Sequence, residues 1–106
     1  MLVSLDFDGV ISTKAPGKRL GTLMEGAKEA LDDLEESGYT LVIHTLRAKT
    51  EKGKEAVENF LDYYELPYND VTNLKPDAII FIDNKAIRFE SWPQTIRDFK
   101  RITGED

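Results

Sequence analysis

Two aspartates, Asp6 and Asp8, are separated by one residue and followed directly by Gly9. Asp6 lies near the end of the mostly apolar run LVSLDF, residues 2–7, and Asp8 directly follows that run. In an extended chain alternate side chains point to the same side, so the two carboxylates lie together while Phe7 turns into the core. Gly9 frees the backbone for a turn. Carboxylates in close contact raise one another's pKa, so the pair predicts a site whose charge a bound cation offsets.

Two other apolar runs end in groups of the same kind. Residues 40–45, TLVIHT, finish at Thr45, and residues 78–82, AIIFI, are followed by Asp83. In open parallel sheets ligands bind at the carboxyl ends of the strands. We therefore expect three carboxylates and a hydroxyl in one crevice. The chain has no cysteine, so a metal there is a hard ion held by oxygen, which favours Mg²⁺ over zinc.

The elements that position these residues alternate along the chain. The three apolar runs are rich in β-branched residues and apolar on both faces, which is typical of buried parallel strands. Between and after them lie three helical patterns. The first follows a Thr22-x-x-Glu25 capping box and ends before Gly38, and the second begins after Thr50 and stops near Glu65. This order predicts an α/β domain with three layers and a mainly parallel sheet.

The third helical pattern begins after Ser91 and runs from Pro93 to about Ile102. Its apolar stripe and the other large aromatic residues are predicted to lie in the core: Phe60, Tyr63, Tyr64, Trp92, Ile96, Phe99. His44 alternates to the face opposite Thr45 and is interpreted as structural. Residues 68–71 could add a short strand and residues 87–89 an edge strand, although neither segment has a strong pattern.

Composition bounds the class of protein. A chain of 106 residues predicts one domain, residues 1–106. The net charge of −6 argues against nonspecific nucleic-acid binding, which needs clustered Lys and Arg. No apolar run approaches the roughly 20 residues of a membrane span, and the first residues are unlike a signal peptide. We expect a cytoplasmic protein without membrane or nucleic-acid partners.

The motifs, taken in order, resemble those of the haloacid dehalogenase (HAD) superfamily of phosphohydrolases. DFDGV, residues 6–10, resembles the first motif, and LVIHT with Thr45 resembles the second. Lys75 in LKPDA matches the single lysine of the third, and IFIDN with Asp83 resembles the acidic fourth. The resemblance covers nearly the whole chain. It implies a Rossmann-like sheet and a Mg²⁺-dependent phosphatase that forms an aspartyl-phosphate.

The resemblance also implies a role for each matched residue. Asp6 would be the nucleophile and Asp8 the general acid and base. The metal ligands would be Asp6, Asp8, Asp83 and Asn84. Thr45 and Lys75 would complete the catalytic set. The substrate phosphate would bind at Gly9, Thr45, Leu46 and Arg47.

Two departures keep other functions open. Asn84 stands where many relatives carry a second acid, and Lys75 precedes Asp83 by only eight residues, which places it toward the other end of the sheet if the chain between them is extended. These features motivate the alternative of a non-catalytic module that binds metal or phosphate. A phosphotransferase using the same intermediate is a third reading.

The chain also lacks the inserted cap domain with which relatives cover small substrates. The first gap between motifs holds only the basic loop of residues 12–22. We therefore expect an open site, a phosphorylated substrate of unspecified identity, and a homo-oligomer or protein partner as the source of any cover. An uncovered site predicts weak, broad activity on small phosphomonoesters.

Overall fold

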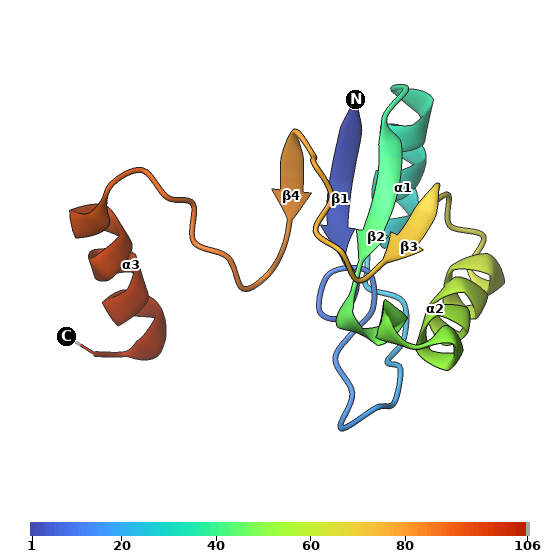
Figure 1. Ribbon diagram of the computed structural model, residues 1–106, viewed down its shortest axis with the longest axis horizontal. Helices are drawn as coiled ribbons and strands as arrows, with labels where there is room; N and C mark the ends of the chain where they lie inside the picture. Colours follow the sequence, from blue (N-terminus) through green and yellow to red (C-terminus); the bar gives the residue numbers. More distant parts are fainter. Residues whose placement is uncertain (106) are drawn as a thin grey trace.

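A computed structural model describes residues 1–105 of the chain (Figure 1). It is an α/β fold with one sheet of four strands, three α-helices and a short 3₁₀ helix, η1. In chain order the elements are β1 (Leu2–Asp6), α1 (Ala27–Glu36), β2 (Thr40–His44), η1 (Leu46–Lys49), α2 (Glu51–Tyr63), β3 (Asp70–Thr72), β4 (Ile80–Ile82) and α3 (Trp92–Thr103).

The sheet is parallel throughout, in the order β3-β2-β1-β4. The first strand of the chain is thus central, with β2 on one side and β4 on the other. Asp6 is in register with His44 of β2, and Leu5 with Ile82 of β4. The parallel sheet predicted from the apolar runs is confirmed, and its carboxyl edge gathers the ends of β1, β2 and β4.

The hydrophobic core lies between one face of the sheet and the helices α1 and α2. Val3, Leu5 and Phe7 alternate toward this face, and Phe7 is fully buried as the alternation predicted. The other members of the cluster come mainly from β2 and the two helices: Ile11, Leu31, Leu41, Ile43, Val57, Phe60, Leu61, Leu66, Val71. This packing fixes β1, and with it the orientation of Asp6.

The start of α1 differs from the sequence prediction. The helix begins at Ala27, after Gly26 in a left-handed conformation (φ 85°), and no side chain caps it. Thr22 is not a cap, because its backbone pairs with Thr13 and its amide donates to the Thr13 Oγ1 at 2.9 Å. Because Thr22 pairs with Thr13 across the loop, the helix begins further along the chain. The capping-box prediction was wrong.

The predicted caps of the other helices are confirmed. Thr50 Oγ1 accepts a hydrogen bond from Gly53 N at 3.0 Å at the start of α2, and Ser91 Oγ accepts one from Gln94 N at 3.4 Å at the start of α3. The optional strand near residues 68–71 forms as β3. Residues 87–89 do not form a strand.

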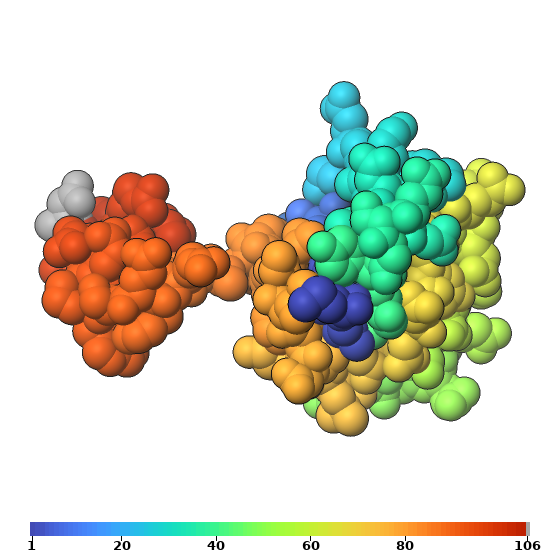
Figure 2. Space-filling view, turned by 90° about the horizontal axis from the view of Figure 1, so that it is seen from above, coloured from blue at the N-terminus to red at the C-terminus, as the bar shows by residue number. Residues whose placement is uncertain are grey.

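Residues 83–105 form an arm that leaves the body of the protein and ends in α3 (Figure 1). Figure 2 shows the arm joined to the body only by a narrow neck. Within residues 1–105, α3 has no buried residue, so a third layer is not assembled within one chain. The prediction that Trp92, Ile96 and Phe99 lie in the core was wrong, and so was the prediction for Tyr63, which is 79% exposed.

No helix within residues 1–105 is both long enough and apolar enough to cross a membrane.

Candidate active site

Asp6 is the last residue of β1 and is half-buried at the carboxyl edge of the sheet. Burial raises the pKa of Asp6 above its ordinary value of 3.8, and the negative charges of Asp83 and Asp8 raise it further. A hydrogen bond from the Phe7 backbone and the nearby His44 act in the opposite direction and lower that pKa. The structure thus brings three acidic groups from the ends of β1 and β4 close enough to interact.

Asp8 is held by a bidentate ion pair with Arg47. The Nε of Arg47 donates to Asp8 Oδ2 at 2.9 Å, and its Nη2 donates to Asp8 Oδ1 at 3.0 Å. The two side chains are 19% and 37% exposed, respectively, so water screens this pair less than a pair on the open surface. The pair joins the end of β1 to η1 and places a cation directly beside the aspartates.

Arg47 also binds the loop that follows β1. Its Nη1 donates to the carbonyl oxygen of Lys18 at 2.7 Å, and its Nη2 donates to that of Arg19 at 2.9 Å. One guanidinium therefore connects η1, Asp8 and the loop of residues 12–22. The loop is folded over the edge of the site by these contacts, and it carries the basic residues Lys14 and Lys18 with it.

Thr45 lies directly after β2, as predicted. It is buried (4% exposed), its amide donates to the Thr72 carbonyl at 2.9 Å, and its Oγ1 accepts a hydrogen bond from Arg47 N at 3.2 Å. The hydroxyl keeps its own proton for donation. Leu46, the next residue, is 75% exposed, so its backbone lies at the open side of the edge.

Asp83 and Asn84 follow β4. Asp83 is exposed and its Oδ1 accepts a hydrogen bond from Lys85 N at 2.8 Å. Asn84 lies against Gly9: a side-chain carbon at Gly9 would overlap the Asn84 amide and come within 3.1 Å of Lys14 Cε. Gly9 also has a left-handed φ of 83°, so glycine is required there for two reasons. The turn after β1 and the turn after β4 are therefore packed directly against each other.

Lys75 reaches the same region from the chain between β3 and β4. Its Nζ lies 4.8 Å from the centre of the Phe81 ring, a cation–π contact. Lys75, His44 and Asp83 line one open hollow of about 650 Å³. Lys75 therefore lies beside Phe81 of β4, in a hollow that extends to Asp83 but is not lined by Asp6, Asp8 or Thr45, and its catalytic role stays a prediction.

Among residues 1–105, no three acidic or histidine side chains are gathered as a metal-binding group. Asp8 turns to Arg47 instead. Mg²⁺ is commonly held by only one or two carboxylates together with water, and Asp6 and Asp83 supply two oxygen ligands of that kind. Leu5 and Ile82 are register partners on adjacent strands, so Asp6 and Asp83, which follow them, lie at neighbouring strand ends and fit a magnesium ion without a third carboxylate.

Two features of the site were missed from the sequence. His44, interpreted as structural, lies in register with Asp6 and faces the hollow that also contains Lys75. Its strand position, equivalent to that of Asp6 in parallel pairing, is the signal that points to this. The second is a basic hollow of about 530 Å³ beside Arg47, lined in part by Lys18, Lys49 and Lys52. Most of its lining comes from residues 46–56, and Lys18 joins it only because the loop of residues 12–22 folds back onto Arg47.

No family model and no curated protein matches this chain. A solved structure described as "Structure of the conserved protein coded by locus from Bacteroides thetaiotaomicron" is similar, with a TM-score of 0.71 and 19% sequence identity. The alignment covers 100% of this chain and 92% of that chain. At this level of identity the likeness shows a shared fold alone.

Proposed function

We propose that this protein is a Mg²⁺-dependent phosphohydrolase that acts on phosphomonoesters through an aspartyl-phosphate on Asp6. The observation that supports it best is the convergence of groups at one edge of the sheet. Asp6, with a raised pKa, lies within the electrostatic reach of Asp8 and Asp83. Arg47 binds Asp8, and the buried Thr45 follows the adjacent strand. Phosphoryl transfer needs a nucleophile, a proton carrier and cationic groups in this kind of arrangement.

The proposed reaction has two steps. In the first, a carboxylate oxygen of Asp6 attacks phosphorus, the bond between phosphorus and the ester oxygen breaks, and Asp8 gives its proton to the leaving alkoxide. In the second, water attacks the phosphorus of the aspartyl-phosphate, the bond between phosphorus and the Asp6 oxygen breaks, and Asp8 takes a proton from the attacking water. Inorganic phosphate leaves, and both aspartates return to their starting states.

Mg²⁺ would be held by the carboxylates of Asp6 and Asp83, by the main-chain carbonyl of Asp8 and by the side chain of Asn84. When bound, it supplies positive charge that offsets the repulsion between the nucleophile and the phosphate. The same charge opposes the crowding that raises the pKa of Asp6. Thr45 and the amide of Leu46 would hold phosphoryl oxygens, and Lys75 would add a cation from the hollow.

Arg47 gives the site a mechanism for exchanging partners. In the structure its guanidinium pairs with Asp8 through two hydrogen bonds. A phosphate group offers the same bidentate geometry and more negative charge, so an incoming substrate competes with Asp8 for Arg47. The exchange would anchor the substrate and release Asp8 for proton transfer in one movement.

The finer features of the fold belong to the same proposal. A single domain of the HAD type without a cap, located in the cytoplasm, agrees with the parallel sheet, with the central position of β1 and with the absence of a membrane-spanning helix from residues 1–105. The third layer of that fold would be formed by α3.

The decisive experiment is release of inorganic phosphate from a panel of phosphomonoesters, with Mg²⁺ and with a chelator. We expect turnover only with Mg²⁺, and a loss of at least about 10³-fold in Asp6→Asn, which keeps the shape of the side chain but removes the nucleophile. Asp33→Asn, on the exposed surface of α1, is the matched control. Full activity of Asp6→Asn would show that the nucleophile is a different group.

A second function, a binding module without turnover, is favoured by the engagement of Asp8 with Arg47 and by the amide at Asn84. The two functions separate by calorimetry with inorganic phosphate and Mg²⁺. A module binds phosphate but releases none from any ester, whereas an enzyme does both. Beryllofluoride, a mimic of the aspartyl-phosphate, should bind with Mg²⁺ only if Asp6 can form the intermediate.

A further inference from the structure

Within residues 1–105, no residue of the apolar stripe of α3 is buried, and its one aromatic contact is that of Trp92 with Phe89 of the same arm, whose ring centroids lie 5.3 Å apart. Trp92, Ile96 and Phe99 recur at helical spacing and are 67%, 47% and 49% exposed. A helix of 12 residues is marginal in water unless an apolar face packs against something, and large exposed apolar patches usually mark interaction sites. The well-formed caps of α3 therefore point to a surface that this helix covers.

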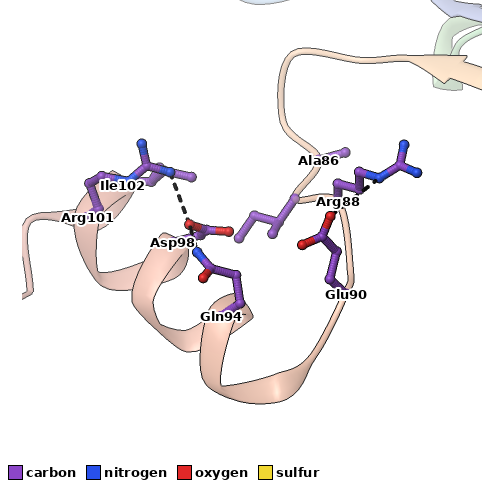
Figure 3. Close-up of a pocket in the computed structure, with 8 residues that line it drawn as sticks. Ala86, Arg88, Glu90, Gln94, Asp98, Arg101 and Ile102 are labelled. Carbon is purple, nitrogen blue, oxygen red and sulfur yellow. Dashed lines mark hydrogen bonds and ion pairs between the residues drawn. The ribbon is translucent and has the colours of Figure 1, made fainter.

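The opposite side of α3 already has a neighbour, the hinge that carries it. Gln94 and Asp98 line a hollow of about 280 Å³ together with hinge residues 86–88 (Figure 3). The Nε2 of Gln94 donates to Asp98 Oδ1 at 2.9 Å, and Arg101 pairs with the same oxygen at 3.2 Å. The polar side of the helix thus faces its own hinge, and the apolar stripe, about half a turn away, faces outward.

In the body of the protein, the strand β4 also has large apolar side chains that nothing covers. Ile80, Phe81 and Ile82 are 54%, 43% and 38% exposed, although their register partners on β1 (Val3, Ser4, Leu5) are buried. The side chains of Ile80 and Ile82 point to one face of the sheet and that of Phe81 to the other. The helices α1 and α2 pack near β2 and β3 and leave β4 without a helix over Ile80 and Ile82. One chain therefore contains an apolar strand that no helix covers and a helix whose apolar stripe packs against no sheet.

We infer that two copies of this chain exchange arms, so that α3 of each copy places its apolar stripe on β4 of the other. Figure 1 shows that the hinge leads α3 away from β4 of its own chain, so we assign the contact to β4 of a second copy. Exchange of an identical element between two copies is a low-cost route to a dimer, and a two-fold axis closes it without leaving an unpaired arm.

The area agrees with a stable dimer. Six large side chains that one such contact can cover are about half exposed: Ile80 and Ile82 on one face of β4, and Phe89, Trp92, Ile96 and Phe99 on the arm. At about 100 Å² each, half of what an aromatic side chain buries, they would remove about 600 Å² per copy and about 1,200 Å² per dimer. Specific interfaces bury about 1,200–2,000 Å² in total.

The first test is the mass of the purified protein by light scattering and sedimentation across a range of concentrations. We expect twice 12.0 kDa at micromolar protein. Emission of Trp92, the single tryptophan, should shift to shorter wavelength as the dimer forms, because its ring leaves water. A monomer at all concentrations up to about 100 μM would overturn the proposal.

The second test separates exchange from any other dimer. Six Gly and Ser residues inserted between Lys85 and Ala86 lengthen the hinge, so that α3 can return to β4 of its own chain. We expect this variant to become a monomer that keeps the emission of the dimer. If it stays a dimer, the arms are not exchanged and the proposal is wrong.

The third test breaks the contact directly. Ile96→Asp with Phe99→Asp should abolish the dimer and leave the far-ultraviolet circular dichroism of the body intact, because neither residue contacts the core in one chain. Tyr63→Asp is the matched control, since Tyr63 is a large exposed side chain away from the arm, and it should leave the dimer intact. A dimer that survives the double substitution would contradict the proposed contact.

Discussion

The body, residues 1–82, and the arm, residues 83–105, carry local signals of equal quality but have different surroundings. The helix α2 begins at a threonine cap and α3 at a serine cap, and each has an apolar stripe. Val57 and Leu61 of α2 are fully buried, whereas no residue of α3 is buried. The local pattern therefore determines that a helix forms. Whether the helix adds to the stability of the core depends on a separate surface for it to pack against.

The largest expected difference is in core packing. Leu61→Ala should lower the free energy of unfolding by about 2–5 kcal/mol at any protein concentration, since it leaves a cavity in the core. Phe99→Ala should have an effect that grows with protein concentration, because its partner surface is in another chain. Urea unfolding at two concentrations tests both, and an effect of Phe99→Ala that is independent of concentration would remove this distinction between body and arm.

A smaller difference is expected between two ion pairs. Arg47→Met should cost about 1–3 kcal/mol, because it breaks a half-buried bidentate pair and two bonds to loop carbonyls. Arg101→Met in the arm, whose side chain is 74% exposed, should cost under about 0.5 kcal/mol. Hydrogen exchange should also show faster opening of residues 13–22 in Arg47→Met alone. Equal costs would mean that burial does not distinguish the two pairs.

A tyrosine in the body should show a measurable pH effect. Burial, with a hydrogen bond to Asp62, raises the pKa of Tyr68 from 10.0 to about 12. Because the folded state holds the proton more tightly, this stabilisation is complete below pH 10 and is lost as pH rises toward 12. Tyr68→Phe should lower the free energy of unfolding by about 1 kcal/mol at neutral pH. It should also remove, from an ultraviolet titration, the tyrosine that ionises at the highest pH. An unchanged titration curve would assign that ionisation to another tyrosine.

The last prediction concerns Asp6 without metal. Its folded pKa lies above 3.8, so the folded state holds the proton after the unfolded state has released it, and stability falls as pH rises through the interval above 3.8. Asp6→Asn should therefore be more stable than the parent at neutral pH, and the two should converge in acid. Thermal unfolding in chelator from pH 3 to 8 measures this, with Asp33→Asn as control. A parent more stable than Asp6→Asn at pH 7 would reverse the sign of the shift.

The parts of the structure that short-range patterns control were predictable. The extended apolar runs, the positions of Asp6 and Thr45 at the ends of those runs, and the caps at Thr50 and Ser91 all depend on neighbours within a few residues. The start of α1 was not predictable, because Thr22 pairs across the loop with Thr13 and is no longer free to cap a helix. The local sequence allows Thr22 either to cap the helix or to pair with Thr13, and only the folded loop shows that it pairs.

The contacts that organise the candidate site were less accessible to sequence. Asp8 and Arg47 are 39 residues apart, and their pairing depends on β1 and β2 lying side by side. The stripe of Trp92, Ile96 and Phe99 has the same pattern whether it packs inside one chain or against another. Periodicity predicts that one face of the helix will be buried, but it does not indicate whether the same chain or another chain packs against that face.

The central position of β1 has a consequence for the synthesis of the protein on the ribosome. One edge of β1 can pair as soon as β2 emerges, but the other edge waits for β4, which is translated much later. Until then the nascent chain exposes an unpaired edge of a strand that carries core residues, which invites pairing with other chains. The brief connection from β3 to β4 shortens this vulnerable interval, because no helix has to be translated between the two strands.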